Sequence, residues 1–154
     1  MIARMRRLIH SIAAKLAWLP PLLARVTLFA IFFPSGKGKL SDLSGPTQYF
    51  TDLGIPFPHF NAILAACVEV GGGALLLVGL LTRVVSLPLI ITMIVAIITA
   101  KWPKLESGWD FFGWDEWAYI VVLLYLFVYG PGALSLDHLL GRKIARDDAS
   151  AAPR

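Results

Sequence analysis

The sequence predicts an all-α integral membrane protein, a four-helix bundle preceded by an amphipathic helix that lies at the membrane interface. Two observations predict this fold class. Of the 154 residues, 57% are hydrophobic and only 16% are charged, whereas a soluble domain carries roughly 25% charged residues. The apolar residues also form four continuous runs without the alternating pattern of a transmembrane barrel. A single membrane domain is therefore expected to span residues 1–154.

Residues 1–16 are expected to form the interfacial helix, because apolar side chains recur there at helical spacing while basic ones fall elsewhere on the wheel. The apolar residues are Met5, Leu8, Ile9, Ile12 and Leu16, and the others are Arg4, Arg6, Arg7, His10 and Lys15. A cleavable signal peptide is the alternative. Pro20, Pro21 and Arg25 interrupt its apolar part, however, and a convincing small-residue cleavage site is missing.

Four apolar runs are long enough to cross about 30 Å of hydrocarbon. They cover residues 16–39, 60–81, 84–100 and 117–134, and each is apolar around its whole circumference, as lipid-facing helices require. Because proline fits best in the first turn of a helix, the first spanning helix is expected to start near Pro20. Residues 145–154 are expected to form a disordered polar tail.

The distribution of lysine and arginine predicts the orientation of these helices. Nine of these basic residues lie on the side of the amino terminus and four on the other side. Because cytoplasmic loops carry the excess of lysine and arginine, both termini are expected in the cytoplasm. The nine are Arg4, Arg6, Arg7, Lys15, Arg83, Arg142, Lys143, Arg146 and Arg154, and the four are Lys37, Lys39, Lys101 and Lys104. This grouping argues against a nucleic-acid-binding stripe and indicates the lipid bilayer as the partner.

Charged residues at membrane depth are candidate functional residues, because an unpaired charge there is costly. Arg25 in the first run and Glu69 in the second meet this criterion. One interpretation is a buried ion pair between them that fixes the register of the two helices, with Arg25 reaching toward the inner interface. The other is a polar cavity, which Lys39 also lines, that binds a head group or relays protons.

Two further sets of charged residues lie near the membrane faces. Glu116 is expected to pair with Lys39 or Lys101 at the outer mouth of the cavity. The alternative is that its negative charge only stabilises the start of its own helix through the helix dipole. Asp137 follows a Gly-Pro-Gly turn on the same side of the membrane as Arg83. An Asp137–Arg83 pair is therefore expected to join the two inner helix ends.

The sequence predicts no intrinsic metal or haem site. His10, His59 and His138 lie at three separate places outside the spanning runs, and Cys67 is the only cysteine. A pair of haem ligands, an iron–sulfur cluster and an internal disulfide are therefore not expected. Any redox role would need an external electron carrier.

Four motifs, taken in order, resemble those of the DoxX family of small four-helix bacterial membrane proteins. They are Arg25 with SGKGKL at 35–40, TDLGIPFP at 51–58, EVGGGALLLVGLLTR at 69–83 and GPGALSLD at 130–137. The sequence departs from the family pattern at the end of the third apolar run. It has Lys101 and Trp102 there, where the family is associated with histidine. This difference argues against a metal or haem role at that position.

The resemblance implies an inner-membrane protein, linked with quinone-dependent sulfur oxidation in some members and with redox or metal-stress complexes in others. We therefore interpret the chain as the membrane subunit of an oxidoreductase system, in which Arg25, Lys39 and Glu69 line a quinone or small-acid site. A partner protein would supply the other half-reaction, and a homo-oligomer is also compatible. The alternative is a non-enzymatic anchor, scaffold or carrier for a lipid or small metabolite.

Overall fold

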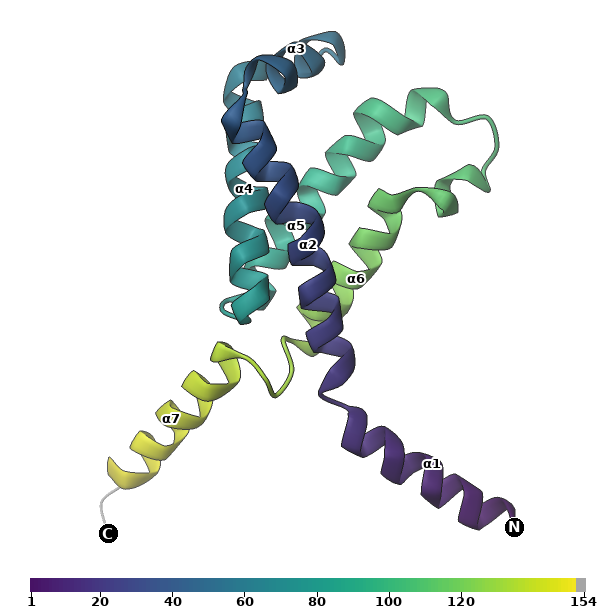
Figure 1. Cartoon of the computed structure of the whole chain (residues 1–154), viewed down its shortest axis with the longest axis vertical. Helices are drawn as coiled ribbons and strands as arrows, with labels where there is room; N and C mark the ends of the chain where they lie inside the picture. Colours follow the sequence, from purple (N-terminus) through teal and green to yellow (C-terminus); the bar gives the residue numbers. More distant parts are fainter. Residues whose placement is uncertain (152–154) are drawn as a thin grey trace.

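The computed structural model describes residues 1–151, and all regular secondary structure within that range is helical (Figure 1). The α-helices are α1 (Ile2–Leu16), α2 (Leu19–Ser41), α3 (Ser44–Asp52), α4 (Pro58–Val78), α5 (Thr82–Ala96), α6 (Asp115–Tyr129) and α7 (Leu136–Ala151). A π-helical turn, η1 (Ile97–Lys101), and a 3₁₀ turn, η2 (Trp102–Lys104), extend α5, and a second 3₁₀ turn, η3 (Asp110–Gly113), precedes α6.

Three helical stretches in the described part of the chain are long and apolar enough to cross a membrane. They are Leu19–Ser41, Pro58–Val78 and Thr82–Lys104, the last being α5 with its two added turns. Pro20 and Pro21 lie in the first turn of α2, where their missing N–H groups cost nothing. α6 ends before Gly130 after 15 residues, so it is about 22 Å long. This is shorter than the hydrocarbon layer of about 30 Å, and a fourth membrane span stays a prediction.

The helices α2, α4, α5 and α6, which we call the helical body, form two pairs. α2 packs along α4, and α6 packs along α5. Figure 1 shows the pairs close together where α4 ends and diverging toward the end that carries α3. The largest fully buried apolar side chains form the core between the pairs: Leu28, Phe32, Leu76, Leu89, Leu123 and Leu126. A pocket lies between the two pairs at the end where they diverge.

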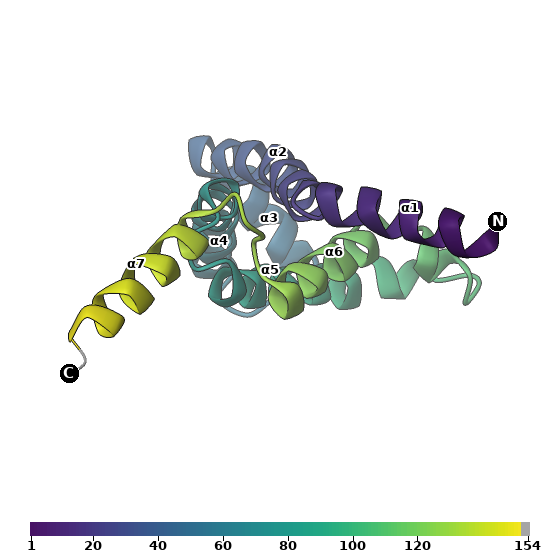
Figure 2. The ribbon, with the colours of Figure 1, turned by 90° about the horizontal axis from the view of Figure 1, so that it is seen from below.

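The terminal helices α1 and α7 both leave the helical body at the end opposite α3 (Figures 1 and 2). α7 continues to Ala151, which differs from the disordered tail predicted from residue 145. Residues 145–151 contain neither glycine nor proline and three of them are alanine, so nothing in their composition stops the helix. Residues 152–154 of the predicted tail lie outside the described residues.

Candidate functional site

The site begins with a close approach of α2 to α4 at Gly36. A Cβ atom added to Gly36 would lie 2.7 Å from the Ala66 carbonyl oxygen and 2.8 Å from the Glu69 Cβ, far inside normal contact distance. Glycine therefore lets the two backbones meet at this point. As a result, the α2 side chains on either side of Gly36 are within reach of Glu69.

Glu69 is buried, with 4% of its surface exposed, and both of its carboxylate oxygens have partners. The Ser35 hydroxyl donates a hydrogen bond to Oε2 at 2.9 Å, and the Lys39 ammonium donates one to Oε1. Lys39 is more exposed than Glu69, so its charge lies toward the open side of the pair. A buried carboxylate thus has both a cationic and a neutral hydrogen-bond donor, which offsets the cost of its burial.

A second lysine–carboxylate pair joins the end of α5 to the start of α6. Lys101 Nζ lies 3.6 Å from Glu116 Oε1. Lys101 is the last residue of the π-helical turn η1, and such turns are frequent at functional sites. Within residues 1–151 the other carboxylate oxygen of Glu116, Oε2, is buried without a hydrogen-bond partner. Glu116 therefore keeps an unused acceptor.

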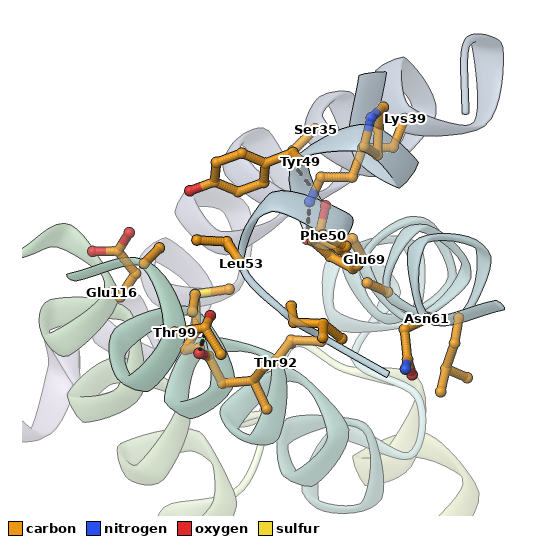
Figure 3. A pocket seen from close by; sticks show the side chains of 18 of the residues that line it. Ser35, Lys39, Tyr49, Phe50, Leu53, Asn61, Glu69, Thr92, Thr99 and Glu116 are labelled. Atoms are coloured by element: carbon orange, nitrogen blue, oxygen red, sulfur yellow. Dashed lines mark hydrogen bonds and ion pairs between the residues drawn. The ribbon is translucent and has the colours of Figure 1, made fainter. Parts of the chain in front are cut away.

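Both ion pairs line one pocket of about 860 Å³, whose lining is mostly apolar. Its walls come from α2, α4, α5 with η1, and α6, and α3 with residues 53–56 completes the lining. In Figure 3, Lys39 and Glu69 come together at one side of the pocket and Glu116 lies away from them at another. The pocket therefore combines a large apolar surface with two separated charged pairs.

Sequence reasoning missed several polar side chains of this pocket. They are Ser35, Tyr49, Asn61, Thr92, Thr99 and Tyr119. Thr92, Thr99 and Asn61 donate to backbone carbonyls of their own segments, whereas the hydroxyls of Tyr49 and Tyr119 have no hydrogen-bond partner in the described part of the chain. The position of Ser35 four residues before Lys39, on the same helix face, was the one usable signal in the sequence.

Arg25 does not pair with Glu69, so the predicted ion pair between them is wrong. Arg25 is 2% exposed and lies at the opposite end of the helical body. Its guanidinium donates to four backbone carbonyls: Nε to Leu76 at 2.7 Å, Nη2 to Leu77 at 2.5 Å, and Nη1 to Pro131 at 3.1 Å and Leu134 at 2.6 Å. The carbonyls in the last turn of a helix lie beyond its regular hydrogen bonds; that of Leu76 also accepts from the Gly79 N–H at 3.0 Å, and Arg25 is a further donor to this turn.

The helix ends on the Arg25 side of the helical body are joined differently from the predicted Arg83–Asp137 pair. Asp137 accepts hydrogen bonds from the backbone N–H groups of Leu81 at 2.8 Å and Thr82 at 3.0 Å, at the start of α5. Arg83 donates to the Val128 carbonyl at 3.2 Å. The exposed N–H groups of a helix start are good partners for a carboxylate, and this explains why Asp137 binds them in place of Arg83.

A carboxylate in the connection between α2 and α3 also has hydrogen-bond donors close by in the chain. Asp42 Oδ1 accepts from the Ser44 hydroxyl at 2.5 Å and from the Ser44 backbone N–H at 2.9 Å. These two bonds favour the charged form and lower the pKa of Asp42 below its ordinary value. Among residues 1–151, no three His, Cys, Asp or Glu side chains are grouped so that they could hold a metal ion.

Comparison with known proteins places this architecture in a family. The DoxX family model matches residues 21–102, the stretch that carries Arg25, Lys39, Glu69 and Lys101. The chain belongs to the DoxX family. No solved structure gives a significant match.

Three DoxX-like relatives match most of the chain. The Bacillus subtilis (strain 168) protein named "Putative oxidoreductase CatD" is 37% identical over 118 residues, which cover 75% of this chain and 83% of the relative. The "Uncharacterized membrane protein Rv3486" of Mycobacterium tuberculosis is 35% identical, covering 77% and 80%. The "Inner membrane protein YphA" of Escherichia coli (strain K12) is 32% identical, covering 75% and 86%. This chain is therefore a DoxX-family membrane protein whose helices contact the lipid bilayer.

Proposed function

We propose that this protein is the membrane subunit of a quinone-linked oxidoreductase system, and that the pocket between its helix pairs binds the quinone ring. The observation that carries this proposal is the placement of two lysine–carboxylate pairs, Lys39–Glu69 and Lys101–Glu116, on one large apolar pocket. The Bacillus subtilis relative that is named "Putative oxidoreductase CatD" supports the same class of activity.

The chemistry of the pocket fits a ring with polar oxygens and an apolar body. Its volume of about 860 Å³ falls in the range of pockets that enclose small ligands, and such pockets are lined mainly by apolar groups with a few placed polar ones. Lys39 and Lys101 offer ammonium donors for quinone carbonyl oxygens. The hydroxyl of Tyr119, which has no hydrogen-bond partner among residues 1–151, is a further donor on the same lining.

Reduction of a quinone takes two electrons and two protons and turns both carbonyl oxygens into hydroxyls. A partner protein supplies the electrons, since this role requires an electron source outside the chain. The chain supplies proton carriers: Glu69 with Lys39 on one side of the pocket, and Glu116 with Lys101 on another. Groups within hydrogen-bond reach of the reacting oxygen are suited to such transfer, and Arg25 takes no part because it lies at the other end.

We further propose that the protein lies in the bacterial inner membrane with both termini in the cytoplasm. The nine-to-four distribution of basic residues and the name of the YphA relative, an inner membrane protein, support this. In a Cys67→Ala background, a Ser107→Cys variant should react with a membrane-impermeant maleimide in intact spheroplasts, and a Gly141→Cys variant should react only after lysis. The reverse pattern would overturn the orientation.

The proposal is tested by ligand-dependent thermal stability of the purified full chain in mild detergent. A short-chain 1,4-naphthoquinone or 1,4-benzoquinone should raise the melting temperature in proportion to occupancy, corresponding to about 2.7 kcal/mol at a concentration one hundred times Kd. Glu69→Gln removes the charge that holds Lys39 and should reduce this protection. Asp52→Asn, an exposed carboxylate that does not line the pocket, is the matched control and should leave it unchanged.

Activity in cells gives the second readout. A deletion strain complemented with Glu69→Gln should keep the deletion phenotype, while Asp52→Asn should complement the deletion. If neither quinone protects the chain at saturating concentration and Glu69→Gln complements fully, the oxidoreductase proposal fails. The anchor, scaffold or carrier function would then replace it.

A further inference from the structure

We infer that α1 is a docking surface for an anionic membrane leaflet, with an apolar face that enters the lipid and basic side chains along both edges of that face. Figures 1 and 2 show α1 extending away from the helical body, on the side opposite α3. The inference concerns a surface outside the pocket and does not depend on which ligand the pocket binds.

The large apolar side chains of α1 lie on one side of the helix. At about 100° per residue they occupy a sector of about 120°, and all of them are exposed: Ile2, Met5, Leu8, Ile9, Ile12 and Leu16. By the same spacing, Arg4 and Lys15 border this sector on one edge and Arg6 borders it on the other. Basic side chains in these positions reach lipid phosphates while the apolar face lies among the acyl chains.

The connection to α2 holds α1 at the surface of the bilayer. α1 ends at Leu16 and α2 begins at Leu19, so the two ends are at most about 11 Å apart. α2 is one of the helices able to span a membrane, and its start therefore lies near the head groups. Trp18, between the two helices, is exposed, and tryptophan is enriched at this depth.

Packing at the start of α2 fixes this junction against the helical body. A Cβ atom added to Gly132 would lie 2.5 Å from Cγ of Pro21, so the segment after α6 is in close contact with the first turn of α2. Arg25, one turn further along α2, donates to the carbonyls of Pro131 and Leu134 in the same segment. α1 is thus attached to a fixed point.

The charge of α1 favours an anionic leaflet over a second copy of the chain. Residues 1–18 contain four arginines and lysines and no acidic residue. Two α1 helices packed through their apolar faces would bring the basic edges of both copies together, and like charges repel at such distances. An anionic leaflet covers the same apolar face and places negative charge beside Arg4, Arg6 and Lys15.

The experiment measures the depth of α1 in vesicles that contain the full-length chain. In a Cys67→Ala background, a spin label is attached at Ile12→Cys, near the middle of the apolar sector, or at Ala14→Cys on the opposite side of the helix. In phosphatidylcholine vesicles that include phosphatidylglycerol, oxygen should relax the label at position 12 more than a water-soluble nickel chelate does. The label at position 14 should show the reverse.

A charge variant tests the role of the basic edges. Each basic residue near an anionic surface strengthens its association by about fivefold, so the triple variant Arg4→Gln, Arg6→Gln, Lys15→Gln should lower the docked-to-undocked ratio on the order of 100-fold. Raised salt should act in the same direction. Lys37→Gln with Lys104→Gln, two exposed lysines near the α3 end, is the matched control and should change nothing.

Two results would overturn the inference. The first is equal accessibility of the labels at positions 12 and 14 to the nickel chelate in phosphatidylglycerol vesicles. The second is protection of the label at position 12 from the nickel chelate that is the same in vesicles of pure phosphatidylcholine and in the triple variant. In this result the protection is accompanied by dipolar coupling between labels on two chains. That pattern would identify a second copy as the occupant of the apolar face.

Discussion

The two ends of the helical body differ in the groups that bind their charged side chains. At one end, the Arg25 end, Arg25 is enclosed and donates to four backbone carbonyls, and Asp137 accepts from two backbone N–H groups. At the other, the Glu69 end, the charged groups are paired lysines and carboxylates on a pocket, and Glu116 keeps a buried oxygen without a partner in the described part of the chain.

This difference separates a structural role from a binding role. Backbone groups do not leave their positions when a ligand arrives, so a side chain that they hold completely is committed to the fold. Side-chain pairs on a pocket wall can exchange one partner for a ligand, because the lysine ammonium has further donors and the carboxylates have further acceptor sites. We therefore assign stability to the Arg25 end and ligand binding to the Glu69 end.

The largest expected effect is the loss of stability on removal of Arg25. Arg25→Ala abolishes four hydrogen bonds from a charged group and should destabilise the detergent-solubilised chain by at least about 3 kcal/mol. Thermal or denaturant unfolding checks this value. A loss below about 1 kcal/mol would show that the four carbonyl contacts contribute little.

The same variant also tests whether the two ends are independent. Leu76, which binds Arg25, lies seven residues along α4 from Glu69, about 10 Å away, and the two charged residues share no partner. The losses of unfolding free energy caused by Arg25→Ala and Glu69→Ala should therefore be additive in the double variant to within about 0.5 kcal/mol. A larger coupling energy would mean that the two ends form one network.

The next effect in size concerns the close approach of α2 to α4. Gly36→Ala places a methyl group against the Ala66 carbonyl and should lower the free energy of unfolding by about 1–3 kcal/mol. Because Lys39 then moves away from Glu69, quinone protection should also be lost. Gly38→Ala is the matched control, since an added Cβ there meets nothing within 4 Å, and it should stabilise α2 by about 0.5–1 kcal/mol. Equal effects of the two substitutions on the melting temperature would contradict the packing argument.

A smaller effect is expected from the helix cap at the Arg25 end. Asp137→Ala leaves the N–H groups of Leu81 and Thr82 without their acceptor and should cost about 1 kcal/mol. Quinone protection should stay unchanged, because Asp137 is remote from the pocket. If Arg83→Ala costs more than Asp137→Ala in the same unfolding assay, our assignment of the cap to Asp137 is wrong.

The smallest effect is a pH dependence in the connection between α2 and α3. The hydrogen bonds from Ser44 lower the pKa of Asp42 in the folded chain, so the charged form stabilises the fold above the ordinary aspartate pKa of about 3.9. That contribution is lost as the pH falls through the lowered value. Ser44→Ala should raise the pKa of Asp42 toward its ordinary value, as measured by NMR titration of its carboxyl carbon, and an unchanged pKa would contradict this cause.

Continuous apolar runs were sufficient to predict the three long apolar helices that the described residues contain. Glu69 was recognised because it is a charged residue within such a run, and Lys39 because it lies close to the end of the first run. The partners of Arg25 and Asp137 were not predictable, because they are backbone carbonyl and N–H groups that every residue carries. The pocket was equally hidden, since the divergence of two helix pairs depends on tertiary packing that single-helix patterns do not encode.

The measurement that tests this assignment most directly compares Arg25→Lys with Glu69→Gln for both melting temperature and quinone protection. Lysine cannot reproduce the planar set of four hydrogen bonds, so Arg25→Lys should unfold at a clearly lower temperature and keep full protection by the naphthoquinone. Glu69→Gln should unfold near the wild-type temperature, because Lys39 is partly exposed and can turn to water, and should lose protection. The opposite pattern, with protection lost in Arg25→Lys and kept in Glu69→Gln, would place the ligand at the Arg25 end and contradict our account.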